Sequence, residues 1–187
     1  MTSSNDAKAT MKAVRIHAFG GPEELRYEDA PRPEPKPGEV LIRIYASAVN
    51  PADWKLRSGL FGKDIPLPLT LGFDFSGVID TLGEGVTRWK VGDEVYGYAL
   101  GAYAEYIAVK ESIAQPPSQT EAEKYGVRAT MALNEMKAES LNAITQLVDS
   151  GKLQAVVDTV LPLSEARRAQ ELIQTGHTRG KIALKVI

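Results

Sequence analysis

The sequence contains no cysteine among its 187 residues and only two histidines, His17 and His177. The absence of cysteine excludes disulfide frameworks, thiolate catalysis and metal sites built on cysteine ligands. Two histidines are too few for a histidine-rich metal cage, and a packing or capping role explains each of them better than catalysis does. We therefore expect no bound metal.

The sequence also lacks an excess of one charge and any long apolar run. Its 22 Lys and Arg residues against 24 Asp and Glu residues give a formal net charge of −2, too little positive charge to neutralise nucleic-acid phosphates. The longest apolar stretch, residues 40–49, contains Arg43 and Ser47 and is far shorter than the roughly 18 residues of a membrane-spanning helix. Residues 1–10 are small and polar, unlike a secretory signal. We expect a disordered tail over residues 1–10, a cytoplasmic location, and neither a nucleic-acid nor a membrane partner.

The composition that remains is that of an ordinary globular chain, with 43% apolar and 25% charged residues. Residues 40–48 carry the strongest strand pattern, in which Val40, Ile42, Ile44, Ala46 and Ala48 share one face. Further short strands are expected at 12–18, 76–82, 94–98 and 103–109, separated by glycine turns. Alternating prolines over residues 31–37 predict an extended connector. These features predict a β-rich α+β fold with a closed or partly closed barrel.

The pattern becomes helical after Pro116-Pro117. Apolar residues at helical spacing predict a helix over residues 138–150 that stops at Gly151. A second helix is expected to begin at Ser164, whose side chain would cap it, and to end at Gly176. Alternating apolar residues from Ile182 onward then predict a closing strand.

A glycine-rich turn is the normal sign of a nucleotide cofactor, and the nearest match is the segment 83–88. Arg88 stands where the third glycine is needed, and Lys90-Val91-Gly92-Asp93 follows in place of a helix. We interpret the segment as a plain turn between strands.

Two other features are compatible with chemistry but do not require it. Asp74 lies between Phe73 and Phe75, where burial would raise its pKa unless a backbone amide or an arginine held it ionised. Trp54 followed by Lys55 offers an aromatic face and a cation to a conjugated carbonyl, although a single tryptophan is more often a core residue. Taken alone, these residues name no reaction.

The order of several motifs carries more information than any single residue. Together they resemble the zinc-independent quinone oxidoreductase branch of the medium-chain dehydrogenase/reductase superfamily, whose catalytic domain is GroES-like. The resemblance rests on Met11-Lys12-Ala13-Val14, Pro37-Gly38-Glu39-Val40-Leu41-Ile42-Arg43, the segment from Ala46 to Gly59, Gly72-Phe73-Asp74-Phe75-Ser76-Gly77-Val78, Gly83-Glu84-Gly85-Val86, Val91-Gly92-Asp93-Glu94-Val95-Tyr96-Gly97, Gly101-Ala102-Tyr103-Ala104-Glu105-Tyr106 and the C-terminal segments 147–163 and 176–182.

Family members carry a Rossmann domain of about 130 to 150 residues between the barrel and the C-terminal segment. This central domain is missing here. Residues 113–117 lead directly into a segment whose sequence resembles the end of the nucleotide-binding domain. The resemblance implies a GroES-like catalytic domain over 11–117, a remnant of the deleted domain over 118–135, and C-terminal helices and a strand over 136–187 that pack back on the barrel. Either an engineered or a natural deletion produces this arrangement.

The resemblance also implies candidate site residues. Asn50 stands where zinc-using relatives place a metal-binding cysteine, and Phe73-Asp74 stands where they have His-Glu, so no catalytic zinc is implied. Asn50 is expected to contact both the substrate carbonyl and the nicotinamide. Lys55 and Phe61 replace tyrosines common in relatives, and Lys55 is the substitute donor for catalysis. The expected substrate-binding residues are Asn50, Asp53, Trp54, Phe61 and Phe73.

The implied parental reaction is hydride transfer from NADPH to a quinone or enone. The glycine-rich fingerprint falls in the missing stretch, so we expect this chain to bind no NADPH and to be inactive, or nearly so, by itself. Losing a positioned hydride donor removes roughly 7 to 11 kcal/mol of proximity advantage. The alternative is a non-catalytic engineered or naturally deleted scaffold module that self-associates, as a homodimer for example, through the surface the deleted domain once covered.

Overall fold

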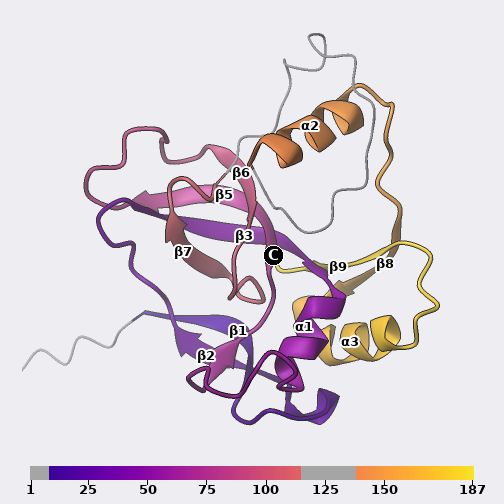
Figure 1. Cartoon of the computed structure of the whole chain (residues 1–187). Helices are drawn as coiled ribbons and strands as arrows, with labels where there is room; N and C mark the ends of the chain where they lie inside the picture. The colour runs from indigo at the N-terminus through magenta and orange to yellow at the C-terminus, as the bar shows by residue number, and fades with distance from the viewer. Residues whose placement is uncertain (1–8, 115–137) are drawn as a thin grey trace, which may run out of the picture.

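The computed structural model describes residues 9–114 and 138–187, which fold into strands with three helices at their edges (Figure 1). The strands form a three-stranded sheet in the order β2-β1-β4 and a six-stranded sheet in the order β6-β5-β3-β9-β8, with β7 also paired to β3. The β-rich α+β class is confirmed. The described strands are divided between two sheets and do not close into a barrel.

The smaller sheet is built by the N-terminal part of the chain. β1 (Thr10–Ile16) pairs antiparallel with β2 (Arg26–Pro31) and with the short β4 (Leu69–Thr70). A single 3-10 turn, η1 (Pro22–Glu24), lies between β1 and β2. β2 was not predicted, because its sequence, Arg-Tyr-Glu-Asp-Ala-Pro, contains no β-branched residue and no apolar alternation that would indicate a strand.

Strand β3 (Glu39–Val49) is the centre of the larger sheet. It pairs antiparallel with β5 (Asp74–Leu82), β7 (Tyr106–Lys110) and β9 (Lys181–Lys185). β6 (Glu94–Tyr98) extends the sheet beyond β5. Several predicted strands are therefore confirmed, although β7 begins three residues later than the expected start at residue 103.

The predicted buried face of β3 is right in its first half and wrong in its second. Val40, Ile42 and Ile44 are fully buried, but Ser47 and Val49 are buried in place of Ala46 and Ala48. The pairing with β5 shifts register between Ile44 and Ala46. Because side chains alternate with a period of two, one extra residue in a bulge moves every following side chain to the opposite face.

The C-terminal segment returns to this sheet. β8 (Val157–Pro162) runs parallel to β9, and α3 (Ala166–Gln174) connects the two strands. α2 (Ala138–Asp149) lies beside β5 and β6 in Figure 1. The predicted first helix and the closing strand are confirmed. The predicted Ser164 cap is wrong, because Leu163–Glu165 forms a 3-10 turn, η2, and α3 begins after Glu165 without a side-chain cap.

Two main clusters of buried side chains hold the fold together. One joins β1, α1 (Pro51–Arg57), α3 and β9 through residues such as Val14, Leu56, Ala169 and Leu184. The other lies between β3, β5 and β6 and contains Ile42 and Ile79 among its members. Because the first cluster needs residues from both ends of the sequence, the C-terminal strand is an integral part of the core.

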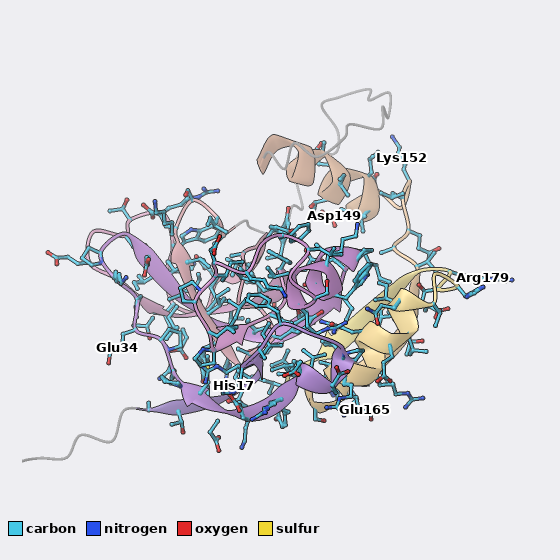
Figure 2. All side chains as sticks on the ribbon, turned by 60° about the horizontal axis from the view of Figure 1, so that its bottom comes forward. His17, Glu34, Asp149, Lys152, Glu165 and Arg179 are labelled. Atoms are coloured by element: carbon cyan, nitrogen blue, oxygen red, sulfur yellow. The ribbon has the colours of Figure 1, made fainter. Side chains whose placement is uncertain are left out.

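Neither histidine belongs to a cluster of metal-ligating side chains. Figure 2 shows His17 just beyond β1, where its Nε2 lies 2.8 Å from Glu28 Oε1, and His177 is exposed before β9. Within residues 9–114 and 138–187, no group of three or more His, Cys, Asp or Glu side chains is placed to hold a metal ion. No helix in the same part of the chain is both long and apolar enough to cross a membrane.

Candidate functional site

Helix α1 is not among the elements predicted from the sequence, yet its start has clear signals. Asn50 is extended (φ −118°, ψ 154°) and Pro51 occupies the first helical turn, where a missing N–H costs nothing. The Asp53 carboxylate accepts a hydrogen bond from the Asn50 backbone N–H at 2.6 Å. This is the reciprocal bond of a capping box, and it ties the backbone of Asn50 to the helix.

Asp53 is fully buried, so its side chain contacts other groups of the protein and is not exposed at the surface. Besides the Asn50 amide, its Oδ2 accepts a hydrogen bond from the Tyr103 hydroxyl at 2.9 Å. Burial raises the pKa of Asp53 to about 7, against the opposing effect of these two hydrogen bonds. Burial, together with Asp53, also raises the pKa of Tyr103 well above its ordinary value. Asp53, which was expected to bind substrate, therefore holds the backbone of Asn50 in place from inside the protein.

The Asn50 side chain bridges a cation and an anion. Its Nδ2 donates to Asp74 Oδ2 at 2.8 Å, and its Oδ1 accepts from Lys181 Nζ at 2.6 Å. Asp74 is the first residue of β5 and Lys181 the first of β9. The side chain of Asn50 is therefore held between the two strands that flank the end of β3.

A cavity of about 310 Å³ opens at these three polar residues. It is lined by Asn50, Asp74, Phe75, Tyr96, Gly97, Tyr98 and Lys181. The sheet register explains this grouping, because Asp74 pairs with Ala48 on one side and with Tyr98 on the other. The cavity combines aromatic walls from β6 with an amide, a carboxylate and an ammonium group, as ligand sites with a few convergent polar groups do.

The aromatic wall extends to a predicted site residue. Phe73 stacks on Tyr98 with ring centroids 5.0 Å apart and an interplanar angle of 11°. Burial, with a further contribution from Asp74, raises the pKa of Tyr98, and its phenol O–H can donate a hydrogen bond. Tyr96 is anchored from the other side, where its hydroxyl lies 2.9 Å from Thr145 Oγ1 of α2.

The remaining predicted site residues do not line this cavity. The Lys55 ammonium lies 5.8 Å from the centre of the neighbouring Trp54 ring, so these two side chains contact each other. Phe61 is 57% exposed in the segment that follows α1. The structure therefore brings together Asn50 and, through its stack on Tyr98, Phe73. It adds Asp74, Tyr96, Tyr98 and Lys181, while Lys55, Trp54 and Phe61 lie outside the cavity lining.

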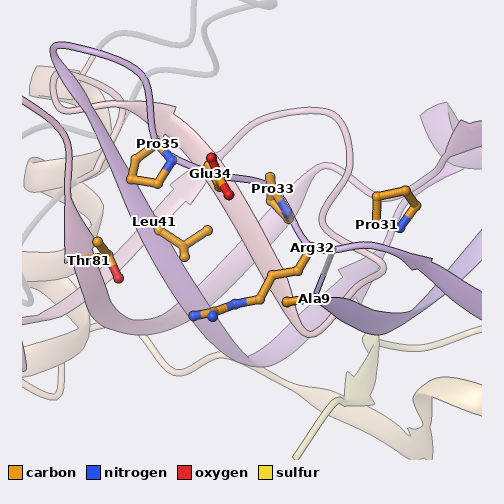
Figure 3. Close-up of a pocket in the computed structure, with 8 residues that line it drawn as sticks. All are labelled: Ala9, Pro31, Arg32, Pro33, Glu34, Pro35, Leu41 and Thr81. Carbon is orange, nitrogen blue, oxygen red and sulfur yellow. The ribbon is translucent and has the colours of Figure 1, made fainter. Parts of the chain in front are cut away.

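A second cavity, of about 410 Å³, lies under the proline-rich connector. In Figure 3 the Arg32 side chain extends from the proline-rich connector toward the side of the cavity where Leu41 and Thr81 lie. Its Nη2 donates to Asp80 Oδ2 at 2.6 Å, and its guanidinium lies 4.1 Å from the centre of the Tyr106 ring. Because the Arg32 guanidinium is already paired and stacked, this cavity offers less to a polar ligand than the first.

The glycine segment 83–85 does not fit the phosphates of a dinucleotide. A Cβ on Gly83 would lie 2.1 Å from the Lys36 carbonyl oxygen, and the Gly83 N–H donates to the Glu39 carbonyl at 2.8 Å. Gly83 therefore packs against the connector. The segment leads from β5 to β6 without the helix whose N-terminus would hold a pyrophosphate. Within the described residues, no strand, glycine turn and helix combine into such a cradle.

Comparison with known proteins agrees with this architecture. Residues 36–118 match the alcohol dehydrogenase GroES-like domain. The chain is 37% identical to the quinone oxidoreductase of Rattus norvegicus over 113 residues, which cover 59% of this chain and 34% of that protein. It is 30% identical to the chloroplastic quinone-oxidoreductase homolog of Spinacia oleracea over 181 residues, covering 92% of this chain and 55% of the relative. The NADPH-dependent alkenal/one oxidoreductase of Arabidopsis thaliana is 37% identical over 125 residues, 60% of this chain and 32% of that protein.

Solved structures show the same fold. The quinone oxidoreductase from Coxiella burnetii superposes with a TM-score of 0.83 at 20% identity, and the match spans 96% of this chain and 100% of the other. A thermostable alcohol dehydrogenase from Pyrobaculum aerophilum gives a TM-score of 0.80 at 18% identity, spanning 95% and 100%.

The described residues therefore share the fold of these solved oxidoreductases, and residues 36–118 match the alcohol dehydrogenase GroES-like domain. In sequence the chain is similar to quinone oxidoreductases, as the sequence motifs implied. It spans about a third to just over a half of the length of these curated relatives.

Proposed function

We propose that this chain is the acceptor-binding part of a quinone oxidoreductase, and that the cavity beside Asn50 holds the planar carbonyl compound. The observation that carries the proposal is the placement of an ammonium and an amide group beside the Tyr96 and Tyr98 rings. Aromatic rings favour a flat conjugated ligand, and the polar groups can orient its oxygen. The names of the relatives, which include quinone and alkenal/one oxidoreductases, support the same ligand class.

Reduction of such a ligand requires a hydride donor as well as an acceptor site. In full-length relatives the family resemblance implies NADPH, and the contact of Asn50 with its nicotinamide stays a prediction. The residues described here supply hydrogen-bond donors for a carbonyl but no phosphate cradle. We therefore propose that the chain by itself binds the acceptor and does not reduce it.

Separate titrations with a quinone and with NADPH test this proposal. Binding of 2-methyl-1,4-naphthoquinone is followed by quenching of intrinsic fluorescence, and binding of NADPH by calorimetry. We expect saturable quinone binding that Tyr98→Ala weakens and Tyr27→Ala does not, because Tyr27 lies on β2 in the other sheet. NADPH is expected to give no saturable heat.

Each outcome has a separate meaning. Absence of saturable quinone binding would contradict the acceptor site. Saturable, quinone-dependent oxidation of NADPH by the purified chain would contradict the proposed lack of reduction. Equal losses in Tyr98→Ala and Tyr27→Ala would place the quinone elsewhere on the protein.

A second candidate function, a self-associating module, is favoured by one observation. β8 is an edge strand of the larger sheet, and Val157 and Val160 on it are 50% and 61% exposed, next to Val156 at 61%. Unpaired strand edges with apolar side chains are sites of strand addition. Two copies can pair their β8 edges about a twofold axis, because an isologous contact uses the same surface twice.

A further inference from the structure

We infer that Lys181 is the residue that binds the carbonyl oxygen of the acceptor, and that Asn50 and Asp74 position its ammonium group. The inference rests on the proposed function, since it names the donor for the ligand proposed above. Lys181 was not among the residues that the sequence analysis selected, and its place in the cavity follows from the pairing of β9 with β3.

The Asn50 side chain already uses part of its hydrogen-bonding capacity within the protein. One donor of its amide is used by Asp74 and its oxygen is used by Lys181. An amide has two donors, so one N–H remains. Lys181 has three donors, of which one is used by Asn50, and hydrogen bonds from a charged donor are about twice as strong as neutral ones. The ammonium of Lys181 is therefore the stronger of the two donors for a ligand.

The neighbouring charged groups also fix the orientation of the Asn50 amide. If Asn50 were turned over, its NH₂ group would face the ammonium and its oxygen would face the Asp74 carboxylate, so both contacts would be repulsive. The charges of Lys181 and Asp74 therefore select a single orientation. Asp74 is itself held in β5, where its backbone carbonyl accepts from Ser47 Oγ at 2.6 Å. The chain of hydrogen bonds from Asp74 through Asn50 to Lys181 fixes the position of the Lys181 ammonium group.

The Lys181 ammonium group is accessible to a ligand in the cavity. The Lys181 backbone N–H donates to the Val156 carbonyl at 2.8 Å, which holds the base of the residue at the start of β9. Its side chain is exposed and lines the cavity. A carbonyl oxygen at the cavity can accept a hydrogen bond from one of the remaining ammonium N–H groups without breaking the bond to Asn50. A positive donor fixed in place stabilises negative charge that develops on that oxygen.

This arrangement predicts a ligand preference. A planar ring with an oxygen at its edge should bind better than the same ring without oxygen, and a ring carrying an ionised oxygen should bind best. Suitable probes are 2-methylnaphthalene, 2-methyl-1,4-naphthoquinone and 2-hydroxy-1,4-naphthoquinone, which is anionic at neutral pH. They share a fused two-ring system and differ in the oxygen offered to Lys181.

The test compares Lys181→Met with Lys185→Met by fluorescence titration with the three probes. Lys185 lies on the same strand and the same face, is exposed, and does not line the cavity. We expect Lys181→Met to weaken the neutral quinone about tenfold and the anionic quinone more, with the hydrocarbon unchanged. Lys185→Met should leave all three affinities unchanged, and Lys181→Arg should restore part of the preference for the anion.

A double-mutant cycle tests the positioning role of Asn50. If Asn50 acts through Lys181, Asn50→Ala should weaken quinone binding in the wild-type chain and have little further effect in the Lys181→Met background. Independent, additive losses would contradict that role. Thermal unfolding of each variant confirms that the fold is intact.

The outcomes separate this inference from the function on which it rests. If the wild-type chain binds no quinone, both fail. If it binds quinone with the same affinity before and after Lys181→Met, the acceptor site stands and the role of Lys181 is overturned. Equal losses in Lys181→Met and Lys185→Met also overturn it, because they indicate a general effect of net charge.

Discussion

Lys181 and Asn50 are 131 residues apart in the sequence, yet Lys181 Nζ donates to Asn50 Oδ1 at 2.6 Å. The contact exists because β9 pairs with the end of β3, where Val49 is opposite Ile182. The candidate site is therefore completed only when the C-terminal strand joins the sheet. Any change that displaces β9 removes both a core element and a polar wall of the cavity.

The buried carboxyl of Asp53 should make stability depend on pH. Its pKa is about 7 in the folded chain and 3.8 is its ordinary value, so the folded state keeps a proton that the unfolded state releases between these values. The free energy of unfolding should therefore fall as pH rises from about 4 to 7, by at most about 1.4 kcal/mol per pH unit, and level off above that range.

Urea unfolding at several pH values between 5 and 8 measures this dependence. Asp53→Asn should flatten the curve relative to the wild-type chain, while Asp29→Asn should not, because the Asp29 side chain is 65% exposed. An unchanged slope in Asp53→Asn would show that another group carries the pH dependence.

The buried pair of Arg57 and Gln170 should be sensitive to loss of either partner. Arg57 is 1% exposed and Gln170 is 0% exposed, and Arg57 Nε donates to Gln170 Oε1 at 2.7 Å. Gln170→Leu leaves the guanidinium without this acceptor, so we expect the free energy of unfolding to fall by about 1.5 to 3 kcal/mol. Gln174→Leu, at the exposed C-terminal end of the same helix, should change it by less than about 0.5 kcal/mol. Denaturant unfolding of both variants decides the point, and similar values for the two would refute the importance of the pair.

Gly72 should tolerate substitution far less than other glycines in the same backbone region. Its φ is +86°, and a Cβ there would lie 2.6 Å from the Tyr103 backbone nitrogen. Gly85 has a φ of +79° with open space around the added atom. We expect Gly85→Ala to cost about 1 to 2 kcal/mol from the left-handed conformation alone, and Gly72→Ala to cost clearly more because the backbone must also move. Equal melting temperatures for the two variants would contradict this explanation.

The exposed edge at β8 should make the chain associate with itself. We expect the average mass in sedimentation equilibrium to rise with concentration and Val160→Lys to reduce it, since a lysine on an edge strand opposes pairing. Val91→Lys serves as the control, because Val91 is also 61% exposed but lies in the turn before β6. A wild-type chain that stays monomeric at high concentration, or equal effects of the two substitutions, would exclude association through β8.

Local patterns in the sequence were sufficient for much of the architecture. The expected end of the first C-terminal helix agrees with Gly151, which has a φ of +69°. The start of α1 was missed although Pro51 and Asp53 carry helix-start signals, because nearby glycines and prolines favoured a loop. The β8 strand was missed because its exposed valines do not alternate with polar residues.

The residues of the candidate site were likewise only partly predictable from the sequence. Asn50 and Phe73 were selected through the family resemblance, and both lie at or next to the cavity. Phe61 and Lys55 were selected by the same route, and Trp54 with Lys55 from the residue types themselves, but none of the three lines it. Tyr96 and Tyr98 lie in a correctly predicted strand, but nothing in their own segment shows that β6 is placed beside Asp74.

The sequence by itself determined the class of fold, most strand positions and the relationship to quinone oxidoreductases, because each depends on short-range alternation, turn residues or ordered motifs. The tertiary structure alone decided which face of β3 is buried after Ile44, and that Lys181 lies against Asn50. The reason is that a bulge and a strand pairing are set by hydrogen bonds between distant segments. Their energy depends on how whole sheets pack, which no local pattern specifies.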